Sequence, residues 1–296
     1  MHHVISTEFR KIMATEQTIG FIGFGAMASR MAAHLVKAGY KALAYTPSGK
    51  GGDGSVPFLP TPAEVARQAD IVLVCVPDDE ALSASMYGPT GALAGMTANG
   101  LLLNTSSVSP EAALSLYDAG KALGVAVVDC PVSGSTPEAD NAALVVLAGG
   151  DTQALAQAKP VFDAIGRLTV QAGPAGSGAR LKLVINGIMG AGLTALAEAV
   201  AYGLAAGLER DMLFGALDEM AVLSPHHKRK PRMAQAGDFS PPFPSPPIPK
   251  DMRLLPAAAA RQALPAPTLS PAPPHPSPPP PFAPASDYPV LIPLTA

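Results

Sequence analysis

Cysteine is nearly absent from this chain of 296 residues. The two cysteines, Cys75 and Cys130, stand at the ends of expected strands and show no CxxC spacing. This spacing favours two buried free thiols, and a disulfide or a redox role is the weaker alternative.

An excess of charge of one sign is also missing, because 20 basic residues stand against 23 acidic ones and the net charge is −3. This balance gives no global bias toward nucleic acids or anionic membranes, and we expect neither as a partner. One basic cluster, HHKRKPR at residues 226–232, is expected to be a solvated loop rather than a nucleic-acid site.

Long apolar runs free of polar residues are lacking as well. The segment richest in Ala, Leu and Gly, residues 188–208, contains Glu198 and is expected to be a buried helix rather than a membrane span. Residues 1–17 lack the apolar core of a signal peptide, and Met13 is an alternative start. We therefore expect a short N-terminal extension over residues 1–17 and a cytoplasmic protein.

A glycine-rich turn links the first expected strand, residues 18–22, to an amphipathic helix over residues 26–38, and it reads GFGAMA. Gly23 would allow the tight turn, Gly25 would let a pyrophosphate approach the main chain, and Ala28 would keep the helix close to the strand. Free N–H groups at the helix start could then bind phosphate, and a turn without a ligand is the weaker alternative. The predicted cofactor contacts here are Gly23, Phe24, Gly25, Ala26 and Met27.

Three further apolar segments have the composition of buried strands: residues 71–76, 101–104 and 125–129. Continuous apolar runs are typical of parallel strands covered on both faces. Helical segments separate these runs, which gives βαβ order. We therefore predict an α/β fold with a Rossmann-type doubly wound parallel sheet over residues 18–174.

The end of the second strand, TPSGKG at residues 46–51, bears on the choice of cofactor. An NAD-selective site usually has an acidic residue here for the ribose 2′-hydroxyl, whereas the first acidic residue in this segment is Asp53. This favours NADP, with NAD as the alternative. Ser48 and Lys50, with Thr46 beside them, are predicted to bind the 2′-phosphate, unless the segment is only a flexible loop.

Adjacent carboxylates follow the third strand, and a serine-rich segment follows the fourth. We expect Asp78 and Asp79 to stabilise a helix start rather than to bind a metal or to act as acid and base, so no metal site is predicted. Ser109, which precedes Pro110, is expected to cap the next helix.

Two later segments carry the predicted chemistry. Ser133, Gly134 and Ser135 would offer hydroxyl and main-chain N–H groups to the carboxylate of a substrate. Lys182 and Asn186 are four residues apart and share one helix face. Oxidising an alcohol needs a base for the hydroxyl proton, and reduction needs the same group as an acid. Lys182 suits this role if its surroundings lower its pKa; the alternative is a lysine extended along an amphipathic helix.

These segments, in this order, resemble the β-hydroxyacid dehydrogenase family, typified by 3-hydroxyisobutyrate dehydrogenase and tartronate semialdehyde reductase. The resemblance covers residues 18–223 and implies an NAD(P)-dependent oxidoreductase with an all-α domain that forms a homodimer or higher oligomer. It also implies that Asn186 positions the substrate. Further cofactor contacts implied by the resemblance are Val76, Pro77, Ser107 and Lys250.

The chain departs from its relatives at two positions near these segments. Many relatives have Gly where this chain has Ser135 and Asn where it has Ile185, so we expect the bound acid to differ in shape from theirs. Retention of Lys182 argues against the more distant imine reductases, which generally lack this lysine, and favours alcohol and aldehyde chemistry.

The C-terminal region is unusually rich in proline. A long helix is expected from residue 175 to about Gly207, starting an all-α domain over residues 175–223. Residues 224–296 contain 22 of the 33 prolines, and each interior proline costs a helix about 3 kcal/mol. We therefore expect an incomplete or disrupted helical domain, with a short helix at residues 256–264 that has Pro256 in its first turn, and polyproline or disordered chain elsewhere.

Together these features predict an NADP-preferring oxidoreductase that interconverts a small β-hydroxy acid with its semialdehyde or keto form, with Lys182 as general acid and base. The alternative is a catalytically weak nucleotide-binding or scaffold protein whose proline-rich arm docks a partner. Ordered helices after residue 224 would favour the enzyme, and a protease-sensitive arm would favour the scaffold.

Overall fold

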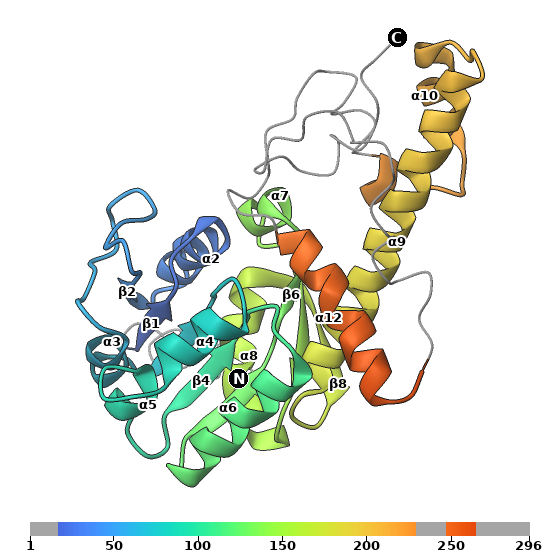
Figure 1. Cartoon of the computed structure of the whole chain (residues 1–296). Helices are drawn as coiled ribbons and strands as arrows, with labels where there is room; N and C mark the ends of the chain where they lie inside the picture. The colour runs from blue at the N-terminus through green and yellow to red at the C-terminus, as the bar shows by residue number, and fades with distance from the viewer. Residues whose placement is uncertain (1–16, 229–246, 265–296) are drawn as a thin grey trace, which may run out of the picture. The chain divides into compact units, whose positions relative to one another are not determined.

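Figure 1 shows the computed structural model, which describes residues 17–228 and 247–264. The chain divides into two units, residues 1–182 and residues 183–296. The predicted N-terminal extension and the predicted polyproline tail from residue 265 onward lie outside the described residues.

Within the described residues, the first unit contains an eight-stranded sheet in the order β2-β1-β3-β4-β5-β7-β6, with β8 paired to β7. The first five strands of that order are parallel, whereas β7 is antiparallel to β5 and β6 and parallel to β8. The strands are β1 (Thr18–Ile22), β2 (Lys41–Tyr45), β3 (Ile71–Val74), β4 (Leu101–Asn104), β5 (Ala126–Asp129), β6 (Val132–Ser133), β7 (Leu144–Gly149) and β8 (Gly166–Gly173).

Helices cover both faces of this sheet. One core contains side chains from α2, α7 and α8, and a second core contains side chains from α3, α4, α5 and α6. The helices are α2 (Ala26–Lys37), α3 (Pro62–Gln68), α4 (Asp79–Met86), α5 (Ala92–Gly95), α6 (Pro110–Ala122), α7 (Thr136–Asp140) and α8 (Thr152–Ile165).

Successive residues of the central strands enter opposite cores. In β3, Ile71 and Leu73 belong to the core with α2 and α8, whereas Val72 and Val74 belong to the core with α3 to α6. All four positions are buried, as the alternation of side chains requires in a strand covered on both sides. The predicted doubly wound α/β fold is confirmed, and the predicted strands coincide with β1 to β5 to within two residues.

The long helix α9 (Ser177–Ala205) begins in the first unit and continues into the second. It ends at Ala205, close to the expected Gly207, whose φ is 85°, and the N–H of Leu208 donates to the carbonyl oxygen of Gly203. By length and composition α9 could cross a membrane, although 44% of its most apolar stretch is buried and a soluble protein's core helix meets the same criteria. The second unit adds α10 (Arg210–Glu219), and Phe214 packs with Val200 in a small core.

Helix α12 (Pro247–Arg261) corrects one expectation. A helix was predicted to begin at Pro256, but the observed helix begins nine residues earlier and contains Pro256 in its interior. Pro247 and Pro249 fall in the first turn, where a missing N–H removes no intrahelical bond. The main chain of Lys250 is therefore helical, while its side chain lies outside the described residues.

The start of the basic cluster is held by intramolecular contacts. The ring of His227 lies against Gly192 of α9, with Nε2 at 3.2 Å from the carbonyl oxygen of Met189. The ammonium of Lys228 donates to the carbonyl oxygen of Asp218. The rest of the cluster lies outside the described residues. Cys75 and Cys130 are free thiols, as expected, and burial raises the pKa of both.

Candidate active site

In the turn between β1 and α2, Gly23 is closely packed, whereas Gly25 faces open space. Gly23 has φ 85°, and a Cβ at this position would lie 2.2 Å from the carbonyl oxygen of Cys75. At Gly25, which precedes α2, a Cβ would meet no atom within 4 Å. The first glycine is therefore required by the fold, whereas the second leaves room in front of the helix start, where the free N–H groups attract a phosphate.

Phe24 contributes its main chain rather than its ring to this turn. Phe24 is 3% exposed, and its ring packs edge-to-face with Phe21 and Phe58, at centroid distances of 5.4 and 5.6 Å. Ala28 is fully buried, as the close packing of helix and strand requires. The predicted phosphate-binding segment is thus a turn anchored by an aromatic cluster.

The loop after β2 brings its predicted polar residues together. The hydroxyl oxygens of Thr46 and Ser48 are 3.1 Å apart, and both hydroxyls donate to the carbonyl oxygen of Lys50 at 3.2 Å. A Cβ on Gly51 would lie 2.4 Å from the carbonyl oxygen of Phe24, so this loop packs directly on the glycine-rich turn. Two segments predicted separately to bind one dinucleotide are therefore neighbours.

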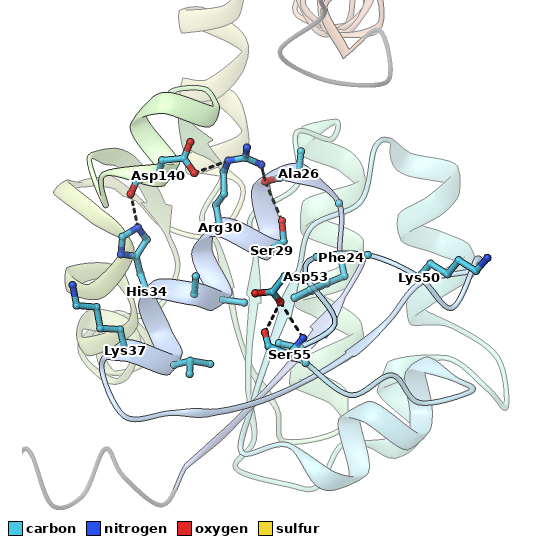
Figure 2. A pocket seen from close by; sticks show the side chains of 17 residues that line it. Phe24, Ala26, Ser29, Arg30, His34, Lys37, Lys50, Asp53, Ser55 and Asp140 are labelled. Carbon is cyan, nitrogen blue, oxygen red and sulfur yellow. Dashed lines mark hydrogen bonds and ion pairs between the residues drawn. The ribbon is translucent and has the colours of Figure 1, made fainter.

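Both segments line a groove along α2, shown in Figure 2. Its lining includes Gly25 and Ala26 of the turn and Lys50 of the loop, whose side chain extends away from the groove in the figure. Arg30, which the sequence analysis did not single out, also lines it. Its guanidinium donates to the carbonyl oxygen of Ala26 at 2.8 Å and pairs with Asp140 at 2.7 Å.

The loops after β3 and β4 are joined by hydrogen bonds. The N–H of Val76 donates to Ser106 Oγ at 3.0 Å, and the N–H of Ser109 donates to Asp79 Oδ1 at 2.8 Å. Asp78 accepts from the N–H of Ala81 at 2.8 Å and so caps the start of α4, as expected, whereas Asp79 accepts from the residue that caps α6. Ser109 caps α6, as predicted. These bonds place the predicted cofactor residues after β3 beside the loop that carries Ser107.

The loop expected to bind a substrate carboxylate already holds one. The N–H and the hydroxyl of Ser135 both donate to Oε2 of Glu138, at 2.7 and 2.9 Å. Ser133 ends β6, and Gly134 has φ 132°, a conformation that favours glycine. The structure thus brings the three predicted residues together with an acidic side chain that the sequence analysis did not select.

Helix α9 carries the predicted amine and amide one turn apart. Lys182 is half-buried and Asn186 is 5% exposed. The start of this helix is attached to the sheet by Asp129, the last residue of β5, which is 3% exposed. Its Oδ1 accepts from the N–H of Gly176 at 3.0 Å, and its Oδ2 accepts from the N–H of Ala179 at 2.8 Å.

Burial raises the pKa of Asp129 to about 6, although main-chain donors favour the charged form. Because this value lies above that of the unfolded chain, the native state binds more protons between about pH 4 and pH 6. The carboxyl group's contribution to stability therefore falls as the pH rises through this window, by about 3 kcal/mol in total. At neutral pH the fold retains a buried charge that opposes its own stability.

Two family models match the chain. The model for the NAD binding domain of 6-phosphogluconate dehydrogenase matches residues 18–173, more than half of the chain. The model described as NAD-binding of NADP-dependent 3-hydroxyisobutyrate dehydrogenase matches residues 176–273. The chain belongs to the β-hydroxyacid dehydrogenase family.

Individual relatives of this family agree. The chain is 35% identical to the NAD-dependent L-serine dehydrogenase of Pseudomonas aeruginosa, over 66% of this chain and 67% of that protein. It is 30% identical to glyoxylate/succinic semialdehyde reductase 1 of Arabidopsis thaliana, over 83% and 86% of the two chains. The solved 3-hydroxyisobutyrate dehydrogenase of Salmonella typhimurium shares the fold, with a TM-score of 0.76 and 22% identity over 86% of this chain and 90% of that chain.

Membership in the β-hydroxyacid dehydrogenase family confirms that the chain is an NAD(P)-dependent oxidoreductase. The residues of the turn and of the 46–50 loop fit such a cofactor, because Gly25 leaves open space at a helix start and a cluster of hydroxyls lies next to it. In the described part of the chain, no group of three or more His, Cys, Asp or Glu residues could hold a metal ion.

Proposed function

We propose that this protein is an NADP-preferring oxidoreductase that interconverts a small carboxylated alcohol, such as a β-hydroxy acid, with its semialdehyde or keto form. The observation that carries this proposal is the placement of Lys182 and Asn186 one turn apart on α9, with the helix start bonded to the strand that leads into the 133–135 loop. Bound NADP would supply the hydride acceptor, and NADPH the donor.

Each residue has a separate part in this reaction. Lys182 Nζ takes the hydroxyl proton during oxidation and returns it to the carbonyl oxygen during reduction. The side-chain amide of Asn186 orients the reacting oxygen. Ser133 and the main-chain N–H of Gly134 hold the carboxylate. A panel of hydroxy acids and semialdehydes, assayed with NADP and with NAD through the absorbance of the nicotinamide, tests this function; failure of every substrate would reject it.

NADPH should bind more tightly than NADH because the loop after β2 offers hydroxyls and a lysine instead of a carboxylate. Lys50→Ala should reduce the preference for NADPH about fivefold, the size of one exposed charge-assisted contact. Fluorescence titration of both reduced cofactors measures this ratio. Lys41→Ala, at the opposite end of β2, is the matched control and should leave the ratio unchanged. A preference for NADH in the parent protein would reject the assignment.

Glu138 should weaken the binding of anionic substrates because it occupies the two donors of Ser135 and adds a negative charge beside them. Glu138→Gln should therefore lower the KM for a carboxylated substrate about two- to fivefold, as expected for a partly exposed charge interaction, with little change in kcat. Steady-state kinetics with an acid and with its uncharged amide separate charge from shape. An equal change for both substrates would show that the charge of Glu138 plays no part.

A further inference from the structure

The buried carboxylate of Asp129 has no part in the proton transfer described above. Its two oxygens accept one N–H each from Gly176 and Ala179, residues that follow it in sequence by about 50 positions. Both donors lie at the start of α9, where free N–H groups and the helix dipole favour a negative charge. Asp129, on strand β5, thus caps the start of α9, a role that a side chain close in sequence usually has.

Two glycines allow the start of α9 and strand β7 to come close to Asp129. A Cβ on Gly178 would lie 2.3 Å from the carbonyl oxygen of Leu147 and 2.5 Å from that of Asp129. A Cβ on Gly149, the residue of β7 that pairs with Asp129, would lie 2.6 Å from Oδ1. The ends of β5 and β7 and the start of α9 therefore meet at one side chain, with no space for a larger residue.

The junction at Asp129 lies close in sequence to the predicted substrate loop and to the predicted catalytic lysine. Four residues after Asp129, the strand β6 ends at Ser133 of the substrate loop. Three residues after Ala179, one helical turn further along α9, stands Lys182. A displacement of the helix start would shift the lysine relative to the loop, and reacting groups lose their effect when misplaced by about 1 Å.

We propose that Asp129 is a positioning residue that fixes the helix start carrying Lys182 against the strand that carries the 133–135 loop. This inference rests on the proposed role of Lys182 in the reaction. A buried ion that lowers stability above pH 6 is consistent with a role in the reaction. An asparagine would retain only one acceptor oxygen and would turn an N–H donor toward the second main-chain N–H.

The test compares Asp129→Ala, Asp129→Asn and Gly178→Ala with the parent protein in kcat, KM, NADPH affinity and amide hydrogen exchange of residues 176–182. We expect kcat to fall at least tenfold in Asp129→Ala and less in Asp129→Asn, with NADPH affinity within twofold of the parent. Amide hydrogen exchange at the start of α9 should be faster in both Asp129 variants than in the parent protein. Gly178→Ala, which moves the helix start while keeping the carboxylate, should reproduce the loss of kcat and remains informative if Asp129→Ala does not fold.

Thr61→Ala is the matched control because it removes a cap from α3 in the same unit and should leave kcat unchanged. The proposal is overturned if the variants keep kcat within twofold of the parent, if exchange at residues 176–182 is unaltered, or if Thr61→Ala lowers kcat equally. If the parent protein converts no substrate, the proposed function fails, whereas unaltered exchange in active variants would reject only the anchoring by Asp129.

Discussion

Replacing Lys182 with alanine should lower kcat by about a hundredfold or more, because the contribution of a general acid and base is about that large. NADPH affinity should remain within about twofold, since the turn and loop predicted to hold the cofactor are separate in the chain from residue 182. Asn186→Ala should lower kcat less, because an orienting amide can be replaced in part by water. Pre-steady-state and steady-state rates with any accepted substrate measure these losses.

Two further variants separate charge from proton transfer. Lys182→Arg preserves the positive charge, but a guanidinium does not release its proton near neutral pH. The turnover of this variant should therefore stay far below that of the parent protein. Arg180→Ala removes an exposed cation from the same helix and should retain the parent rate. Parent-like turnover in Lys182→Ala would show that the proton passes through another group.

The second large effect is expected at Gly25. Gly25→Val should weaken NADPH binding at least tenfold, because its side chain would fill the open space at the helix start and keep the pyrophosphate from the N–H groups. The melting temperature should fall by only a few degrees, since φ at this position is −82° and no atom lies within 4 Å of the added Cβ. Calorimetric titration and thermal denaturation together measure both effects.

Gly23→Ala provides the contrast. Its Cβ would collide with the carbonyl oxygen of Cys75 at a positive φ, so this variant should lose stability before it loses affinity. Unchanged NADPH affinity in a folded Gly25→Val variant would place the pyrophosphate elsewhere.

The central sheet was predictable because parallel strands buried on both faces are continuous apolar runs, as in β3 and β4. The capping roles of Asp78 and Ser109 follow from local sequence and were also predicted correctly. The helix start predicted at Pro256 was wrong. The number of prolines alone does not show which of them lie in the first turn of α12.

One part of the site that was not predicted depends on a contact between distant segments. The bond from Gly176 to Asp129 spans 47 residues, and no local pattern reports it. Its available signals were an aspartate ending an apolar strand and glycines at 176 and 178. Glu138 had a local signal, because serine followed three residues later by glutamate is the capping-box pattern. This pattern competes with the anion site predicted at Ser135, because both use the same two donors.

The most direct test of the account follows the hydride itself. The parent protein is incubated with a semialdehyde that it accepts and with NADPH that carries deuterium at the transferred position of the nicotinamide ring. Mass spectrometry of the product then reports the atom that was moved. We expect a hydroxy acid carrying one deuterium at the former carbonyl carbon. An alcohol product without deuterium, or no conversion of any carboxylated aldehyde or ketone, would contradict the proposed reaction.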